Sequence, residues 1–291
     1  MYFTELLLAA ALSRFEAVEP HMGTLFRVTV YAESPEQARN GFQAAFARAR
    51  ELDERMSDYR EDSELNRLCR AAGGQASTDL AAILRQATEI ARESGGAFDV
   101  TAGPVVRLWR AARRARRVPG ADEIESARRL VDWRSVRVDR TGRVRLRPGM
   151  QLDLGGIAKG YAADQMLLAL ERAGIARALV AASGDLAASG GPPGTRGWRI
   201  GIEGLDETMA LVHAAISTSG DDEQGFDAEG VRYSHIVDPR TGMALRNSRK
   251  VTVIARRGWR ADALATALSV SGPGSYRARR GERVIFHAGR N

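Results

Sequence analysis

The sequence predicts a mixed α+β fold, because strand-like and helix-like segments alternate along it without a regular βαβ rhythm. Apolar residues make up 44% of the 291 residues and charged residues 27%, which is the usual composition of a globular protein with a core. Neither a long linker nor a short repeat divides the chain. We therefore expect one domain over residues 21–291, with room for two sub-lobes, after an N-terminal extension over residues 1–20.

The first half of the chain predicts one strand followed by several helices. Residues 25–31 alternate between apolar and polar side chains, as a half-buried strand does. The segment SPEQ at residues 34–37 is a capping box with proline at the first helical position, and it predicts a helix that runs to Met56. Further helices are expected to begin near residues 62–66, at residue 79 and after residues 97–104, and the last of them ends at residues 119–120.

The second half is richer in strands. A hairpin is expected over residues 136–146, and a helix follows the glycines at residues 155–156 and ends at Gly174. Beyond it we expect a loop at residues 189–197, a tight turn at residues 238–242 and a helix at residues 261–268. The strands expected in this half are residues 178–182, 198–202, 210–216, 232–237, 251–255 and 283–287.

The apolar stretch at residues 6–12 is too short to span a bilayer. It lacks a preceding basic segment, a cleavage site and a lipid-accepting cysteine. We interpret it as an N-terminal helix or as the sign of a mis-set start, with a degraded export signal as the alternative. The visible N-terminus therefore favours a cytoplasmic protein with no stable membrane span.

Charge and cysteine content limit the classes of function. The net charge is +7 with a pI near 10.1, which suggests nucleic acid as a partner. Aromatic residues are only 6% and the arginines are dispersed, so we expect no nucleic-acid platform. The densest basic cluster, RLWRAARRARR at residues 107–117, predicts a solvated helix face, or else a patch for an anionic ligand or a membrane surface. The single cysteine, Cys69, excludes an internal disulfide and a cysteine-based metal site.

The segment DLGGIAKGYAAD at residues 153–164 has the features of a phosphate site. Gly155 and Gly156 let a ligand approach the main chain, and the helix that begins here directs N–H groups toward an anion. Lys159 adds a full charge, and it is one of only two lysines, with Lys250, among 43 basic residues. The segment is neither a Walker A loop nor a dinucleotide fingerprint. The alternative is an ordinary strand-to-helix turn with a surface lysine.

Asp262 and Thr266 lie four residues apart in ADALAT, so on a helix both would face the same side. A carboxylate and a hydroxyl in an apolar setting suit a hard cation such as Mg²⁺, which takes few protein oxygens and adds substrate phosphates. The alternative is that Asp262 caps the helix and Thr266 packs in the core.

His235 stands just before the turn at residues 238–242. It is either a half-buried strand histidine or a group that moves a proton near neutral pH. The hydroxyl-rich segment ISTSGD at residues 216–221 binds polar ligand atoms or forms a turn.

In this order, these segments resemble one family, the FAD:protein FMN transferases of the ApbE type, over residues 22–269. The matching segments are MGT at residues 22–24, MSDY at 56–59, SELN at 63–66, FDVTAGP at 98–104, LW at 108–109, DLGGIAKGY at 153–161, ISTSGD at 216–221, SHIVDPRTG at 234–242 and ADALAT at 261–266.

The resemblance implies a T-fold-like α+β fold with mixed antiparallel sheets, in which FAD lies between sub-lobes. The FAD contacts that it implies are Met22, Tyr59, Ala97, Phe98, Asp99, Asp153, Lys159 and Ile236. The Mg²⁺ contacts that it implies are the main-chain oxygen of Gly156 and the side chains of Asp262 and Thr266.

The implied reaction transfers FMN from FAD to a Thr or Ser hydroxyl of an acceptor flavoprotein and releases AMP. We expect His235 to accept the proton of that hydroxyl. Two alternatives remain, namely a Mg²⁺-dependent FAD pyrophosphatase and a redox protein that holds FAD and transfers nothing. Asp262 and Thr266 favour the two enzymes, because a carrier needs no cation beside the pyrophosphate.

Three segments depart from the family pattern. Ser183-Gly184-Asp185 replaces a Gly-Gly-acid sequence, Asp222 replaces an aromatic residue, and Met243-Ala244 stands where a proline is usual. These departures bear more on which acceptor protein is chosen than on the binding of FAD. Exported family members carry a signal peptide with a lipidated cysteine, so a periplasmic or membrane-associated location requires a mis-set start.

Overall fold

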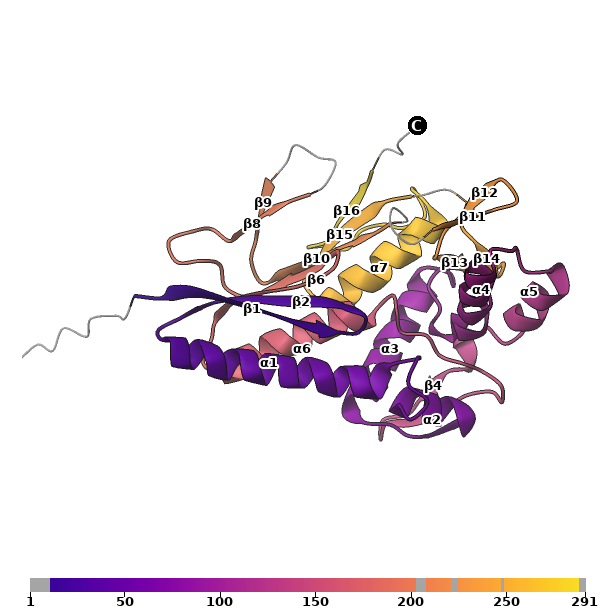
Figure 1. Cartoon of the computed structure of the whole chain (residues 1–291), viewed down its shortest axis with the longest axis horizontal. Coiled ribbons are helices and arrows are strands. Elements are labelled where there is room, and N and C mark those ends of the chain that lie inside the picture. The colour runs from indigo at the N-terminus through magenta and orange to yellow at the C-terminus, as the bar shows by residue number, and fades with distance from the viewer. Residues whose placement is uncertain (1–10, 203–207, 221–224, 247–248, 288–291) are drawn as a thin grey trace, which may run out of the picture.

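The computed structural model describes residues 11–202, 208–220, 225–246 and 249–287. Its centre is a seven-stranded sheet in the order β1-β2-β6-β7-β10-β15-β16, in which every neighbouring pair is antiparallel (Figure 1). The strands are β1 (Ser13–His21), β2 (Thr24–Ala32), β6 (Arg177–Ala182), β7 (Asp185–Ala188), β10 (Ala214–Ser219), β15 (Val251–Ala255) and β16 (Arg283–Phe286).

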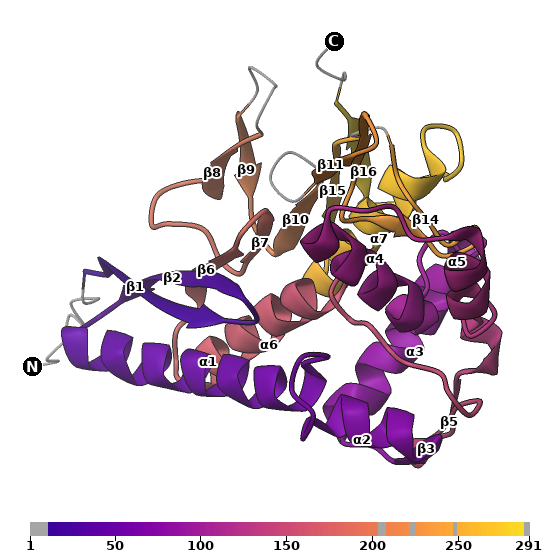
Figure 2. The same cartoon turned by 45° about the vertical axis from the view of Figure 1, so that its right-hand side comes forward.

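Three helices cover one face of this sheet, as Figures 1 and 2 show. They are α1 (Pro35–Met56), α6 (Ala158–Arg172) and α7 (Gly258–Ser271). The start of α1 is the predicted cap, since Ser34 Oγ accepts a hydrogen bond from Gln37 N at 3.1 Å. Phe26, Leu52 and Met166 are fully buried between the helices and the sheet, so the main core lies in this layer.

A hairpin of β8 (Trp198–Gly201) and β9 (Thr208–Leu211) lies on the other face of the sheet. Its apolar side chains form a second cluster with residues of the sheet, namely Ala188, Trp198, Ile200, Ile202, Leu211, Ile216 and Ile254. Because Ala215 belongs to the main core and Ile216 to this cluster, β10 is apolar on both faces.

A second lobe of helices and short strands lies on the right of Figure 1. Its helices are α2 (Glu64–Arg70), α3 (Thr78–Glu93), α4 (Gly103–Ala115) and α5 (Ala121–Arg128), with two 3-10 turns at Val100–Ala102 and Trp133–Ser135. Its strands are β3 (Gly73–Gln75), β4 (Arg137–Val138), β5 (Arg143–Arg145), β11 (Phe226–Ala228), β12 (Val231–Tyr233), β13 (Val237–Asp238) and β14 (Met243–Ala244). Trp109 of α4 packs on Tyr233 and donates a hydrogen bond from Nε1 to Gly242 O at 2.8 Å, which fixes the turn after β13.

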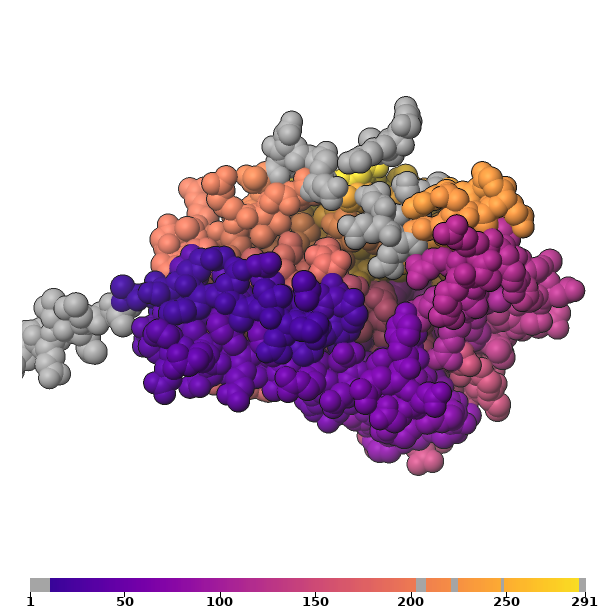
Figure 3. Space-filling model, viewed as in Figure 1, coloured from indigo at the N-terminus to yellow at the C-terminus, as the bar shows by residue number. Residues whose placement is uncertain are grey.

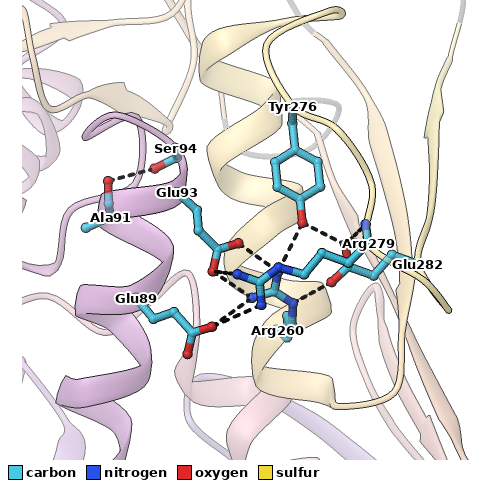
Figure 4. A network of polar contacts seen from close by, with 8 residues as sticks. All are labelled: Glu89, Ala91, Glu93, Ser94, Arg260, Tyr276, Arg279 and Glu282. Carbon is cyan, nitrogen blue, oxygen red and sulfur yellow. Dashed lines mark hydrogen bonds and ion pairs between the residues drawn. The ribbon is translucent and has the colours of Figure 1, made fainter.

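Arg260 joins α7 to this lobe (Figure 4). Arg260 is 8% exposed, and its guanidinium pairs with Glu93 at the end of α3 at 2.7 Å and with Glu282 at 2.5 Å. Tyr276 Oη also lies 3.0 Å from this guanidinium, and it donates a hydrogen bond to Glu282 at 2.6 Å. The segment that follows α7 is thereby held against α3.

The expected α+β class with antiparallel sheets is confirmed, but several expected elements differ. The strand expected at residues 210–216 is two strands, because the chain turns at His213, whose φ is +46°. The strand expected at residues 232–237 is likewise divided between β12 and β13. Helix α7 begins at Gly258, so Asp262 lies inside it and the alternative of a capping role is wrong.

The N-terminal region contains a strand that the sequence did not reveal. All of β1 except His21 lies within the stretch expected as an extension, and it pairs with β2 from Ser13↔Ala32 to His21↔Thr24. Phe15, Ala17 and His21 of this strand pack against the core, with the His21 ring on Phe26 and Phe46. The helix expected at residues 6–12 falls mostly outside the described residues, as does Asp222. In the described part of the chain, no helix is both long and apolar enough to cross a membrane.

Candidate functional site

The first turns of α6 and α7 lie against each other with almost no side chain between them. A Cβ on Gly160 would overlap the carbonyl oxygen of Gly258 and lie 2.8 Å from the Cβ of Asp262. Asp164 accepts hydrogen bonds from the N–H groups of Gly258 and Trp259, at 2.8 and 3.2 Å, and thereby caps α7. This contact brings the glycine-rich turn before α6 to the side of α7 that carries Asp262.

The residues expected to bind a cation lie close to one another at this contact. A Cβ on Gly156 would lie 2.9 Å from Thr266 Oγ1, so the main chain at Gly156 and this hydroxyl are neighbours. Asp262 is 4% exposed, and its Oδ2 accepts a hydrogen bond from Gly160 N at 3.0 Å. A carboxylate, a hydroxyl and a carbonyl are hard oxygen donors, so this set fits Mg²⁺. Across the described residues, no group of three His, Cys, Asp or Glu side chains could hold a metal, so a cation here needs further oxygens from substrate or water.

Lys159 points back over the same turn and lies between two buried carboxylates. Its Nζ is 3.2 Å from Asp185 Oδ2, 3.8 Å from Asp262 Oδ2 and 3.3 Å from the carbonyl oxygen of Gly155, to which it donates. The expected alternative of an ordinary surface lysine is therefore wrong. Burial lowers the pKa of Lys159, but Asp185 and Asp262 outweigh this and raise it above its usual value. Burial, with a further contribution from Asp185, raises the pKa of Asp262 to about 7.

Asp153 holds the turn from its other side. Its Oδ1 accepts a hydrogen bond from Gly155 N at 2.7 Å, and its Oδ2 accepts one from Arg110 at 2.9 Å. Arg110 also donates to Asp58 and lies over the ring of Tyr59, 4.7 Å from its centroid. Burial raises the pKa of Asp153, although Arg110 opposes this change. Two expected FAD contacts, Asp153 and Tyr59, are thus connected through Arg110.

Tyr59 and Met22 occupy exposed turns. Tyr59 is 75% exposed, so its ring is open to a ligand on the side away from Arg110. Met22 lies in the β1–β2 turn with a φ of +48°, and its N donates to Asp53 Oδ2 at 3.0 Å. Met22 also lines a shallow surface hollow with Leu25 and Asp53.

The expected contacts at residues 97–99 are all buried, and they differ in what their side chains contact. Asp99 is 8% exposed, and its carboxylate accepts hydrogen bonds from Thr101 N at 2.8 Å, Thr101 Oγ1 at 2.7 Å and Trp133 N at 3.0 Å. Its side chain therefore holds the local main chain, and burial raises its pKa. Phe98 lies beside the glycine turn, because a Cβ on Gly156 would be 3.3 Å from Phe98 Cε2.

Ala97 and Ile236 are brought together although they are far apart in the sequence. Both are buried in a small apolar cluster with Val270. Ser234 Oγ accepts a hydrogen bond from Ile236 N at 2.9 Å and fixes the segment between β12 and β13. His235 lies in this segment, outside both strands and exposed, so the alternative of a half-buried strand histidine is wrong.

The hydroxyl-rich segment is mainly a strand rather than a loop. Ser217 and Thr218 belong to β10, and Ser217 Oγ donates a hydrogen bond to Asp185.

In Figure 3 the surface is recessed between the indigo N-terminal strands and the magenta lobe, and rose-coloured atoms from the middle of the chain are visible there. Gly156 lies between Thr266 of α7 and Phe98 of the second lobe, so the glycine turn is at a place where the two parts of the molecule meet.

A model of the ApbE family matches residues 22–282 of this chain. The chain belongs to the ApbE family. Among its relatives, the FAD:protein FMN transferases of Vibrio cholerae and Treponema pallidum are 33% and 34% identical. The alignments cover 87% and 90% of this chain and 80% of each relative.

Solved structures of ApbE proteins have the same fold. The apo flavinyl transferase ApbE of Pseudomonas stutzeri superimposes with a TM-score of 0.82 at 29% identity, over 95% of each chain. The ApbE protein of Thermotoga maritima gives a TM-score of 0.84 at 29% identity, over 94% of each chain. The resemblance inferred from the motifs and the expected fold are therefore confirmed.

Two residues of this ApbE-family site were not found by sequence reasoning. Asp185 was noted only as a departure from the family pattern, yet it pairs with Lys159. Arg110 was assigned to a solvated helix face, yet it bridges Asp58 and Asp153. In the remainder of that basic cluster, Arg114, Arg116 and Arg117 are exposed as expected.

Proposed function

We propose that the chain is an enzyme that transfers FMN from FAD to a Thr or Ser hydroxyl of an acceptor flavoprotein, with release of AMP. Its curated relatives are named FAD:protein FMN transferases and match most of the chain. The observation that carries the proposal is the meeting of Lys159, Asp262 and Thr266 at the glycine turn of an ApbE-family chain.

The cation in this proposal is Mg²⁺, held by the carbonyl of Gly156 and the side chains of Asp262 and Thr266. When bound, Mg²⁺ withdraws negative charge from the oxygens of the phosphates. The apolar residues between Asp262 and Thr266 on α7 are buried, which fixes both side chains on one face of the helix. No rearrangement of the helix is needed to present the two oxygens.

Lys159 and the positive end of the α6 helix dipole would bind the pyrophosphate of FAD. A helix N-terminus and an ammonium both stabilise anionic oxygens. The side chain of Lys159 is 25% exposed, so its charge is accessible to a ligand from the turn. The role of these groups is to orient the phosphorus for in-line attack, which needs position more than covalent help.

The remaining expected contacts would hold the two ends of FAD. Tyr59 offers an exposed ring for stacking, and Arg110 sets the orientation of that ring. Phe98 supplies an apolar side chain next to the glycine turn, and Ala97 and Ile236 supply others in their cluster with Val270. Asp99 would contact FAD through its main-chain atoms, because its carboxylate already accepts hydrogen bonds from Thr101 N and Trp133 N.

His235 would accept the proton of the attacking hydroxyl. In this step the hydroxyl oxygen bonds to the phosphorus of the FMN half, the bond to AMP breaks, and the hydroxyl proton moves to the imidazole. The exposure of His235 lets a protein segment approach it. A His235→Ala variant should lose turnover and retain FAD binding, and unchanged turnover would exclude this role.

The test incubates the purified chain with FAD and Mg²⁺, with and without an acceptor flavoprotein domain. AMP release and covalent flavin on the acceptor are followed together. Both products should appear, and both should be lost in Asp262→Ala. AMP and free FMN without labelled acceptor would instead support the pyrophosphatase. Bound FAD with neither product would support the redox carrier.

A further inference from the structure

Asp185 is held in one position by the sheet around it. It begins β7, and in the antiparallel pairing of β7 and β10 it stands directly opposite Ser217. Ser217 Oγ donates a hydrogen bond to Asp185 Oδ1, and the two residues are 5% and 2% exposed. The other carboxylate oxygen, Oδ2, is the one that pairs with Lys159. Residues directly opposite on a sheet keep their side chains together, so this carboxylate cannot easily turn away.

The ammonium of Lys159 lies near two carboxylates, those of Asp185 and Asp262, and it is closer to Asp185. Its Nζ is 3.2 Å from Asp185 and 3.8 Å from Asp262, so the closer ion pair is with Asp185. The interaction of two charges weakens with distance, and only the shorter separation is within hydrogen-bonding range. Asp185 thus draws the ammonium away from Asp262.

The charges at this contact have a direct consequence for a cation. When both carboxylates are ionised, Asp185 and Asp262 contribute one negative charge each and Lys159 one positive charge, so the three groups together carry one negative charge. Without Asp185, Lys159 and Asp262 would form a neutral buried pair. A cation could then reach Asp262 only by displacing the ammonium, which is costly at a buried site.

We propose that Asp185, fixed by Ser217, is a positioning residue that holds Lys159 off Asp262 and so keeps Asp262 available to a divalent cation. This inference rests on the proposed cation site of Gly156, Asp262 and Thr266. It gives Asp185 no contact with the cation. Asp185 acts on the cation through Lys159.

The test measures the binding of Mn²⁺, used in place of Mg²⁺, by the loss of the free-ion EPR signal on titration of the purified full chain. Asp185→Asn keeps an acceptor for Ser217 and removes the charge, so Mn²⁺ affinity should fall by about tenfold or more. In the Asp185→Asn/Lys159→Met double variant both charges are gone, and Mn²⁺ affinity should return to within about threefold of the wild type. A merely structural role would not produce this rescue.

The other outcomes distinguish a positioning role of Asp185 from a role as a ligand or a structural residue. If the double variant binds Mn²⁺ as weakly as Asp185→Asn, Asp185 is itself a ligand or a structural residue, and the inference is wrong. Lys159→Met alone should bind Mn²⁺ at least as tightly as the wild type, and weaker binding would also overturn the inference, even if Asp185→Asn fails to fold. If the wild type binds no Mn²⁺ while it still retains FAD, the proposed cation site fails first and the inference falls with it.

Discussion

At the residue scale, the site depends on the absence of side chains at a few positions. Gly156 and Gly160 have ordinary φ values, so the backbone conformation does not require glycine there. They are glycine because another element occupies the space of a Cβ, namely Thr266 at one position and the backbone at Gly258 at the other. The family resemblance implied that Gly156 lies near Asp262 and Thr266, but it gave no sign that the backbone at Gly258 lies against Gly160.

The closeness of α6 and α7 is tested by Gly160→Ala. The added methyl would overlap the backbone of α7, so we expect the free energy of unfolding to fall by about 2–3 kcal/mol. Gly201→Ala is the matched control, because nothing lies within 4 Å of a Cβ there, and it should change stability by less than about 1 kcal/mol. Urea unfolding followed by circular dichroism measures both. Equal stabilities of the two variants would show that the helices are not in close contact.

The residues that sequence reasoning missed share a physical cause. Asp185 and Arg110 act through ion pairs with residues distant in the chain, and no local pattern marks such a partner. His235 was found by its motif, but its exposure follows from the path of the chain between β12 and β13. The resemblance therefore predicted that the glycine turn lies near Asp262 and Thr266, whereas the ion pairs of Asp185 and Arg110 were not predicted.

At the element scale, the start of α7 is set by a residue of another helix. Asp164 on α6 accepts the two N–H bonds that a capping side chain would normally accept from its own helix. This explains why the sequence predicted α7 to begin at residue 261 rather than at Gly258, since no cap precedes it in the chain. Helix α1 was predicted from its first residue, because its cap, Ser34, directly precedes it in the chain.

The cap at Asp164 predicts a specific pH dependence. Burial raises the pKa of Asp164 to about 6, above its ordinary value of 3.8. The folded state therefore binds this proton more tightly than the unfolded state does. The resulting stabilisation is complete below about pH 4 and is lost as pH rises through about 6. It amounts to about 2–3 kcal/mol at most.

Asp164→Asn removes this titration and keeps an oxygen that accepts the N–H bonds. Relative to the wild type, the variant should become more stable as pH rises from 4 to 7, by urea unfolding at each pH. Asp164→Ala should be less stable than Asp164→Asn at both values, because it leaves two N–H groups without an acceptor. A constant difference between wild type and Asp164→Asn would contradict the raised pKa.

At the scale of the whole molecule, α7 connects the sheet layer with the helical lobe. It packs on the sheet through its apolar face, and Arg260 joins it to α3 and to the segment around Glu282. The same helix carries Asp262 and Thr266, so the position of the candidate cation site depends on this connection. Sequence patterning predicted the fold class and most helices, but it gave no sign of Arg260, whose partners are more than 150 residues away on one side.

Replacement of Arg260 tests how strongly the connection stabilises the fold. Arg260→Met removes the ion pair of Glu282, which is 6% exposed, and leaves Glu93, which is 15% exposed, to pair with Arg279 at the surface. We expect a loss of about 3 kcal/mol or more in the free energy of unfolding. Arg279→Met is the control, since Arg279 is 52% exposed and also pairs with Glu93, and it should cost less than about 1 kcal/mol. Thermal unfolding by calorimetry would compare the two, and equal losses would mean that burial of Arg260 has no special effect.

The intact mass of the acceptor tests most directly whether this chain attaches FMN to a protein hydroxyl. An acceptor flavoprotein domain would be incubated with the chain, FAD and Mg²⁺, beside the same domain with its candidate Thr or Ser replaced by Ala. The account predicts a mass gain of one FMN less one water on the first domain, none on the second, and none when the chain carries Asp262→Ala. An unchanged mass on every domain, with AMP and free FMN in solution, would contradict it.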